Sequence, residues 1–142
     1  RWFRRLAEGV FDVPNLLSRT EELADWTIVN VEGPRIALGF SNGANVAAAA
    51  LLLRPETFDA AILLAPMVPF EPESLPVLDG KPIFMLCGER DPMVPRPNAQ
   101  ALATMFETAG ADLTLHWHPG GHALDPVGAR VAASWLAGKF PA

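Results

Sequence analysis

Gly39-Phe40-Ser41-Asn42-Gly43 is the stretch of this sequence that says most about its fold. It has the form G-x-S-x-G, follows the short apolar run 35–40 and opens the alanine- and leucine-rich segment 43–53. The run has the length of a buried strand, and the segment contains no helix breaker, so a strand, a sharp turn and a buried helix are predicted in that order. Such a turn exposes its serine at the end of the strand, and a side chain at either flanking glycine is expected to crowd the backbone crossing.

The same alternation of apolar runs and helical segments continues along the chain. The predicted strands after the first are 60–65, 82–87 and 112–117, and the other predicted helices are 18–26, 98–108 and 127–139. The proline-rich segment 67–80 is predicted to be a long surface loop. Because helices separate the strands, the connections are crossovers and the fold class is α/β, a mostly parallel sheet flanked by helices.

Length and composition set the broad class. The chain has 142 residues, which fits a single domain over 1–142, and half of them are apolar. Its 16 acidic and 11 basic side chains give a net charge of −5, so it lacks the positive field that binds phosphate backbones and no nucleic-acid partner is expected. No run of 18 apolar residues and no cleavable leader is visible, so we expect no membrane partner and a cytoplasmic location.

Two further residues complete a catalytic pattern around Ser41. A serine hydroxyl is a weak nucleophile that needs a base within hydrogen-bond reach and a third group to orient the base. Asp91 follows the third predicted strand and His122 follows the fourth, at the carboxyl edge where parallel sheets bind ligands. Singly, Asp91 is an ordinary turn aspartate and His122 an ordinary loop histidine. Together, and in the order serine, acid, histidine, they predict a catalytic triad.

Other polar residues near these strand ends are alternatives to the triad. Asp125 and Glu89 are the alternative acids, and Asp91 is preferred for its place in the turn. His116 and His118 could join His122 in a metal site, but the thiols or carboxylates that zinc usually recruits are not clustered there, so no metal is expected. The single cysteine, Cys87, ends a buried strand, where a cysteine is most often a small apolar filler.

Three motifs carry a resemblance to a known family. They are Gly-Phe-Ser-Asn-Gly-Ala-Asn at 39–45, Gly-Glu-Arg-Asp-Pro-Met-Val-Pro at 88–95 and His-Trp-His-Pro-Gly-Gly-His at 116–122, supported by Trp2-Phe3. With them the sequence resembles the α/β-hydrolase superfamily, and within it the small carboxylesterase, phospholipase and thioesterase branch that includes bacterial esterases linked to hydroquinone resistance. The resemblance implies that Ser41 is the nucleophile, Asp91 the acid and His122 the base of a cofactor-free enzyme that hydrolyses esters through an acyl-enzyme.

The sequence departs from this family at its start. Family members begin with further strands, and a loop there, usually with a His-Gly pair, donates the second oxyanion-hole N–H. This chain has no His-Gly dipeptide, so only the N–H of Asn42 is an identified donor. We therefore expect the chain to be N-terminally truncated relative to the family, the C-terminal part of an α/β-hydrolase fold. The strand 35–40 would then have an open edge, and a homo-oligomer or a complementing N-terminal segment is the expected partner.

The apolar residues at the strand ends suggest a substrate pocket. The predicted substrate-binding residues are Phe40, Met67, Val68, Met93, Val94 and Trp117, with Phe70 and Leu124 nearby. Arg1, Arg4 and Arg5 could meet an anionic substrate, although a solvated helix face is their expected role. The predicted function is a serine carboxylesterase for small-molecule short to medium acyl or aryl esters. The alternatives are a thioesterase or lysophospholipase, or a weakly active or inactive binding module.

Overall fold

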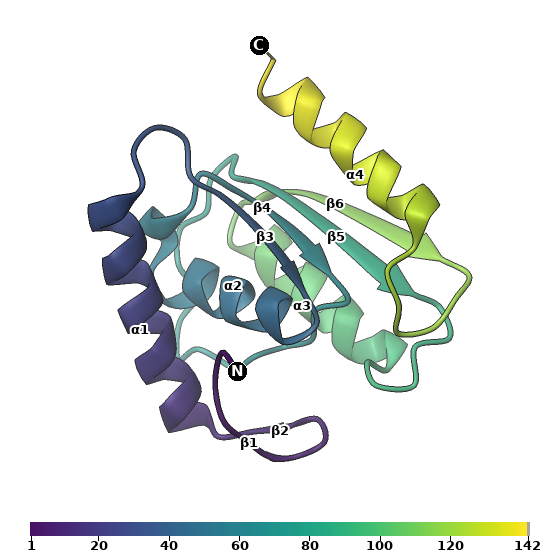
Figure 1. Ribbon diagram of the computed structural model, residues 1–142, viewed down its shortest axis with the longest axis horizontal. Helices are drawn as coiled ribbons and strands as arrows, with labels where there is room; N and C mark the ends of the chain where they lie inside the picture. Colours follow the sequence, from purple (N-terminus) through teal and green to yellow (C-terminus); the bar gives the residue numbers. More distant parts are fainter. Residues whose placement is uncertain (142) are drawn as a thin grey trace.

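A four-stranded parallel sheet forms the centre of the molecule (Figure 1). The computed structural model describes residues 1–141. The strands lie in the order β3-β4-β5-β6 and are β3 (Ile36–Phe40), β4 (Ala60–Leu64), β5 (Pro82–Gly88) and β6 (Asp112–His118). All neighbouring pairs are parallel, so the predicted α/β class is confirmed.

Helices cover both faces of the sheet. One face carries α2 (Asn42–Leu53) and α3 (Arg96–Thr108), and the other carries α4 (Pro126–Lys139). The longest helix, α1 (Val13–Asn30), packs against α2 from outside, and the short 3-10 helix η1 (Pro55–Thr57) follows α2. Residues 44–52 of α2 are all buried, because α2 lies between the sheet and α1.

The central strands are apolar throughout because both of their faces are covered. On β5, Ile83 and Met85 pack against α2 and α3, whereas Phe84 and Leu86 pack against α4. Alternate residues of a strand point to opposite faces, so a strand covered on both sides has no polar positions. This explains the uninterrupted apolar runs from which the strands were predicted.

The N-terminal part differs from the sequence-based expectation. The helix predicted over 18–26 extends over Val13–Asn30, because Asp12 accepts a hydrogen bond from the N–H of Asn15 as its N-cap and Pro14 lies in the first turn. Ahead of it, β1 (Arg5–Ala7) and β2 (Val10–Phe11) form an antiparallel hairpin that was not predicted. Its turn contains Gly9, whose positive φ of 70° suits glycine.

β3 is an edge strand of the sheet in the described chain. Leu38, in its middle, faces away from α2 and is 71% exposed, since α4 lies over β5 and β6 rather than over β3 (Figure 1). Within residues 1–141, none of the helices combines the length and apolar character needed to span a bilayer.

Candidate active site

Ser41 lies on the strained turn that joins β3 to α2. Its φ of 54° and ψ of −115° fall outside the regions that residues with a side chain normally occupy. The turn is held on both sides: the Ser41 N–H donates to the carbonyl of Leu64 at 2.8 Å, and the Ser41 carbonyl accepts from the N–H of Asn45 at 2.9 Å. The serine hydroxyl is thereby fixed at the carboxyl edge of the sheet.

The two glycines of the G-x-S-x-G motif have different roles. A Cβ on Gly39 would fall 2.5 Å from the carbonyl oxygen of Gly43 and 2.6 Å from the backbone nitrogen of Ala44. A Cβ on Gly43 would meet only the indole nitrogen of Trp2, at 3.5 Å. The expectation that both positions exclude a side chain is therefore wrong for Gly43, because only Gly39 lies against backbone at the crossing of strand and helix.

The structure brings the three predicted catalytic side chains into one hydrogen-bonded chain. The Ser41 Oγ and the His122 Nε2 are 2.9 Å apart, and the His122 Nδ1 lies 2.7 Å from the Asp91 Oδ2. The other oxygen of Asp91, Oδ1, accepts from the N–H groups of Met93 and Val94 at 2.8 and 3.1 Å. The Asp91 side chain is only 1% exposed, so its carboxylate is held by these three hydrogen bonds rather than by solvent.

The loops that carry Asp91 and His122 are tied directly to each other. The N–H of Glu89 donates to the carbonyl of His118 at 2.8 Å, and the N–H of Arg90 donates to the carbonyl of Gly120 at 3.0 Å. At the end of β5, a Cβ on Gly88 would fall 2.5 Å from the carbonyl oxygen of Gly121. The absence of a side chain at Gly88 thus lets the histidine loop approach the aspartate turn.

The two alternative acids lie elsewhere. Asp125 is the N-cap of α4, where it accepts from the N–H of Gly128 at 2.6 Å. The Oε1 of Glu89 lies 4.0 Å from the Nη1 of Arg96. Of the three candidates, only Asp91 is hydrogen-bonded to His122.

Asn42 supplies an N–H beside the serine. It is the first residue of α2, so its N–H has no acceptor within the helix, and the helix dipole adds positive potential at this end. A negatively charged oxygen next to Ser41 would be stabilised there, which is the position predicted for the first oxyanion donor.

A small cavity of about 20 Å³ adjoins Ser41 and His122, roughly the space of one water molecule. Of the predicted substrate-binding residues, Met67, Met93 and Val94 line it. Five residues outside the predicted pocket set also line it: Arg5, Gly9, Phe11, Asn45 and Ala65. The hairpin therefore forms part of the site.

The remaining predicted pocket residues lie outside this cavity. The ring of Phe40 lies beside the ring of His122, with centroids 5.4 Å apart, and Trp117 lies under the guanidinium of Arg96 at 4.4 Å. The N–H of Val68 donates to the Oδ1 of Asn98, and the Val68 side chain packs on the core. Phe70 faces a separate groove beside α1, and Leu124 is 59% exposed.

Asn45 is a polar side chain of the site that sequence reasoning missed. It is 3% exposed, and its Oδ1 accepts from the N–H of Met67 at 2.8 Å, which fixes the loop after β4 against α2. Asn45 lies four residues after Ser41, one helical turn further along, and this spacing could have indicated that its side chain lies near the serine.

Cys87 and the histidines of β6 fit non-catalytic roles. Cys87 is buried, and burial, with a smaller contribution from the charge of Asp91, raises the pKa of its thiol to about 12. His118 is buried as well, and its Nδ1 accepts from the N–H of Gly120 at 3.1 Å. Among residues 1–141, no three His, Cys, Asp or Glu side chains are grouped as metal ligands would be.

A parallel sheet with a serine on a strained turn after one strand, and an acid and a histidine after later ones, defines the α/β-hydrolase class of proteins. Within that class, the chain belongs to the dienelactone hydrolase family, whose model matches residues 15–130.

Individual relatives agree with this assignment. The chain is 38% identical over 141 residues to MhqD of Bacillus subtilis, which is named as a hydrolase, and covers 70% of that protein with 95% of its own length. A carboxylesterase of Bacillus cereus superposes with a TM-score of 0.94 at 36% identity, over 99% of this chain and 69% of the other. The Atu2452 protein of Agrobacterium tumefaciens, described as of unknown function, superposes with a TM-score of 0.90 at 40% identity, over 97% of this chain and 70% of the other.

Proposed function

We propose that this protein is a serine carboxylesterase. The observation that carries the proposal is the hydrogen-bonded chain from Ser41 through His122 to Asp91, with distances of 2.9 and 2.7 Å. Similarity to a carboxylesterase of Bacillus cereus supports the same reaction. In this scheme Ser41 is the nucleophile, His122 the general base and Asp91 the group that orients the histidine.

The proposed reaction has two halves. In the first, the Ser41 Oγ attacks the ester carbonyl carbon while the His122 Nε2 takes the hydroxyl proton, and His122 then gives this proton to the departing alcohol. In the second, His122 removes a proton from water as the water attacks the acyl-enzyme, and it returns that proton to Ser41 as the acid leaves. The hydrogen bond from Nδ1 to Asp91 keeps Nε2 free to accept in both halves.

The proposed substrates are esters with short to medium acyl or aryl groups. The cavity beside Ser41 has an apolar lining from Phe11, Ala65, Met67, Met93 and Val94. Methionine side chains adapt to differently shaped apolar groups, which suits a range of acyl chains. Thioesters and lysophospholipids present the same carbonyl chemistry and are the competing substrate classes.

A weakly active hydrolase that serves as a binding module is the second candidate function. It rests on the N–H of Asn42, the first residue of α2, as the one oxyanion donor that the G-x-S-x-G motif identifies in the described residues 1–141. Removal of one such donor in a studied protease lowers turnover by about 10²–10³.

Labelling with a fluorophosphonate probe tests the two candidates. The esterase proposal expects labelling of the native protein that disappears in Ser41→Ala, and hydrolysis of 4-nitrophenyl esters from acetate to octanoate. A correctly folded protein that takes up no probe and hydrolyses none of these esters would overturn the esterase proposal in favour of the binding module.

A further inference from the structure

The side-chain amide of Asn45 is bound to the protein through its oxygen only. Asn45 lies on α2 one turn after Ser41, is 3% exposed and lines the cavity beside Ser41 and His122. Its Oδ1 accepts from the N–H of Met67 at 2.8 Å. Because a backbone N–H can only donate, the amide oxygen must face Met67, and the NH₂ group of the same amide must point away from it.

The NH₂ group of Asn45 has no hydrogen-bond acceptor within residues 1–141. Among the same residues, the side-chain polar atoms that are fully enclosed without a partner are the Oγ1 of Thr57 and the Nε1 of Trp135. The Nδ2 of Asn45 is therefore not sealed in by protein, and it opens into the catalytic cavity that this residue lines. A donor on so deeply buried a side chain costs free energy unless an acceptor reaches it.

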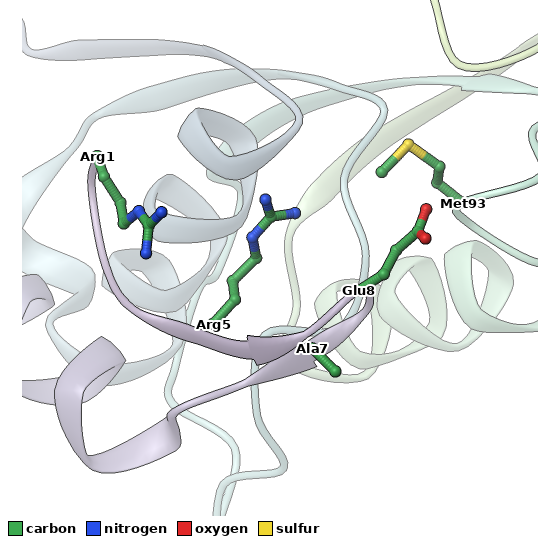
Figure 2. Close-up of a pocket in the computed structure, with 5 residues that line it drawn as sticks. All are labelled: Arg1, Arg5, Ala7, Glu8 and Met93. Atoms are coloured by element: carbon green, nitrogen blue, oxygen red, sulfur yellow. The ribbon is translucent and has the colours of Figure 1, made fainter.

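The N-terminal hairpin and the loop after β5 enclose the space in front of this NH₂ group. Gly9 and Phe11 of the hairpin line the catalytic cavity, as does Met93 of the loop. Figure 2 shows the side chain of Glu8, in the turn between β1 and β2, extending toward Met93. The cavity holds about 20 Å³, so a group that contacts Asn45 lies only a few bonds from an ester carbonyl placed at the serine.

We propose that the NH₂ group of Asn45 donates a hydrogen bond to the substrate, and that the preferred substrates are esters with a second oxygen acceptor a few bonds from the reacting carbonyl. This inference rests on the proposed esterase function. An ether, hydroxyl or carbonyl oxygen at this position accepts from the NH₂ group, whereas a methylene group would cover the NH₂ group and leave it unpaired. The acceptor belongs to the acyl part or to the alcohol part of the ester, and the test below has an arm for each.

Pairs of esters that differ by one oxygen in place of a methylene group test the proposal. For the acyl part, 4-nitrophenyl methoxyacetate is compared with 4-nitrophenyl butyrate; for the alcohol part, 2-methoxyethyl acetate is compared with butyl acetate. In at least one pair we expect the ratio of kcat/KM, ether ester over alkyl ester, to fall about tenfold from the wild type to Asn45→Leu. The ether oxygen also makes the ester chemically more reactive, but that effect is common to all variants and cancels when their ratios are compared.

Two further variants separate donation to the substrate from positioning of the loop after β4. Asn45→Asp keeps an oxygen for the N–H of Met67 but, when ionised, has no proton to donate, so its ratio should fall as in Asn45→Leu. Asn98→Leu is the matched control, because the Oδ1 of Asn98 accepts from the N–H of the next loop residue, Val68, at 2.8 Å without lining the cavity. It should keep the wild-type ratio. Thermal melting identifies a variant that has failed to fold, and Asn45→Asp then replaces Asn45→Leu in the comparison.

Three results would overturn the proposal while leaving the esterase function intact. The first is an unchanged ratio in both pairs for Asn45→Leu, including an equal loss of both esters, which donation to the ester carbonyl itself would give. The second is a ratio that falls in Asn45→Leu but not in Asn45→Asp. The third is a ratio that falls equally in Asn98→Leu. The second and third results would assign the effect to the position of the loop.

If the wild type hydrolyses no ester at all, the proposed function fails, and NMR decides the role of Asn45 separately. The side-chain NH₂ signal of Asn45 is assigned by its loss in Asn45→Leu and is followed in Ser41→Ala, which binds esters without forming an acyl-enzyme. A shift of this signal that an ether ester causes and its alkyl counterpart does not cause supports the proposal. Equal shifts within both pairs, or no shift, refute it.

Discussion

Gly39 leaves no room for a side chain because its missing Cβ would fall 2.5 Å from the carbonyl oxygen of Gly43. We predict that Gly39→Ala displaces the serine turn, at a cost in stability of about 1–3 kcal/mol from overpacking. Displacement of Ser41 by about 1 Å is enough to lower turnover on the order of 100-fold. Hydrolysis of a 4-nitrophenyl ester and a chemical denaturation curve measure the two effects.

Gly43→Ala is the control for this prediction, because the nearest atom to its new Cβ would be the Trp2 indole nitrogen at 3.5 Å. Activity should be retained, and stability should be equal or higher, since alanine is favoured over glycine in a helix by about 0.5–1 kcal/mol. Equal losses of activity and stability in Gly39→Ala and Gly43→Ala would show that the close approach of backbone to Gly39 does not fix the serine turn.

Asp91 is predicted to control the tautomer of His122. In Asp91→Asn the new amide can still accept from the N–H groups of Met93 and Val94, so the fold should persist. Its NH₂ group would donate to the His122 Nδ1, which places the ring proton on Nε2 and removes the base from Ser41. The expected fall in kcat is on the order of 10⁴.

Asp125→Ala tests whether Asp125, rather than Asp91, is the acid of the triad. Because Asp125 caps α4, its loss should lower stability by about 1 kcal/mol without changing turnover. A loss of activity in Asp125→Ala that exceeds the loss in Asp91→Asn would reverse the assignment of the acid.

The arrangement of Ser41, Asp91 and His122 could be predicted because parallel strands bring their carboxyl ends to one edge. Because β3, β5 and β6 are apolar runs of one parallel sheet, the residues that follow them are expected at the same edge of that sheet. The buried helix α2 was equally predictable, since its sequence between sheet and α1 has no polar face.

Which strand-end residues line the cavity could not be predicted, because that depends on the face to which each side chain points. Phe40 directly precedes Ser41, yet its ring lies beside the ring of His122 and does not line the cavity. Met67 does line the cavity, in a loop that is hydrogen-bonded to Asn45. Arg5 was expected on a solvated helix face and instead lies in β1, at the cavity. The strands β1 and β2 have three and two residues, which is too short for an alternating sequence pattern to be recognised.

Cys87 is predicted to be unreactive in the native protein. Burial raises the pKa of its thiol to about 12 from an ordinary value of 9.0, so at pH 8 the thiolate fraction is about 10⁻⁴. A thiol reagent should label the native protein negligibly and the protein in guanidinium completely. Rapid labelling of the native state would contradict the burial of this residue.

The same shift predicts a dependence of stability on pH. The Cys87 thiol keeps its proton to a higher pH in the folded protein than in the unfolded protein. Above pH 9.0 the unfolded state therefore binds fewer protons than the folded state. The free energy of unfolding should fall between pH 9.0 and about 12. Cys87→Ala should remove this part of the pH dependence and, because the cysteine lies outside the hydrogen-bonded chain at Ser41, retain activity.

The edge strand β3 is predicted to mediate self-association. Its outer backbone groups have no partner strand in the described chain, and Leu38 in its middle is 71% exposed, which together form a template for a second copy. Lysine at such a position opposes pairing, so Leu38→Lys should lower the mass measured by light scattering during size-exclusion chromatography. Val77→Lys, at an apolar loop residue that is 75% exposed, adds the same charge away from the sheet and should leave the mass unchanged. A wild-type chain that is a folded monomer at all concentrations, or an equal effect of both lysines, would refute an interface at β3.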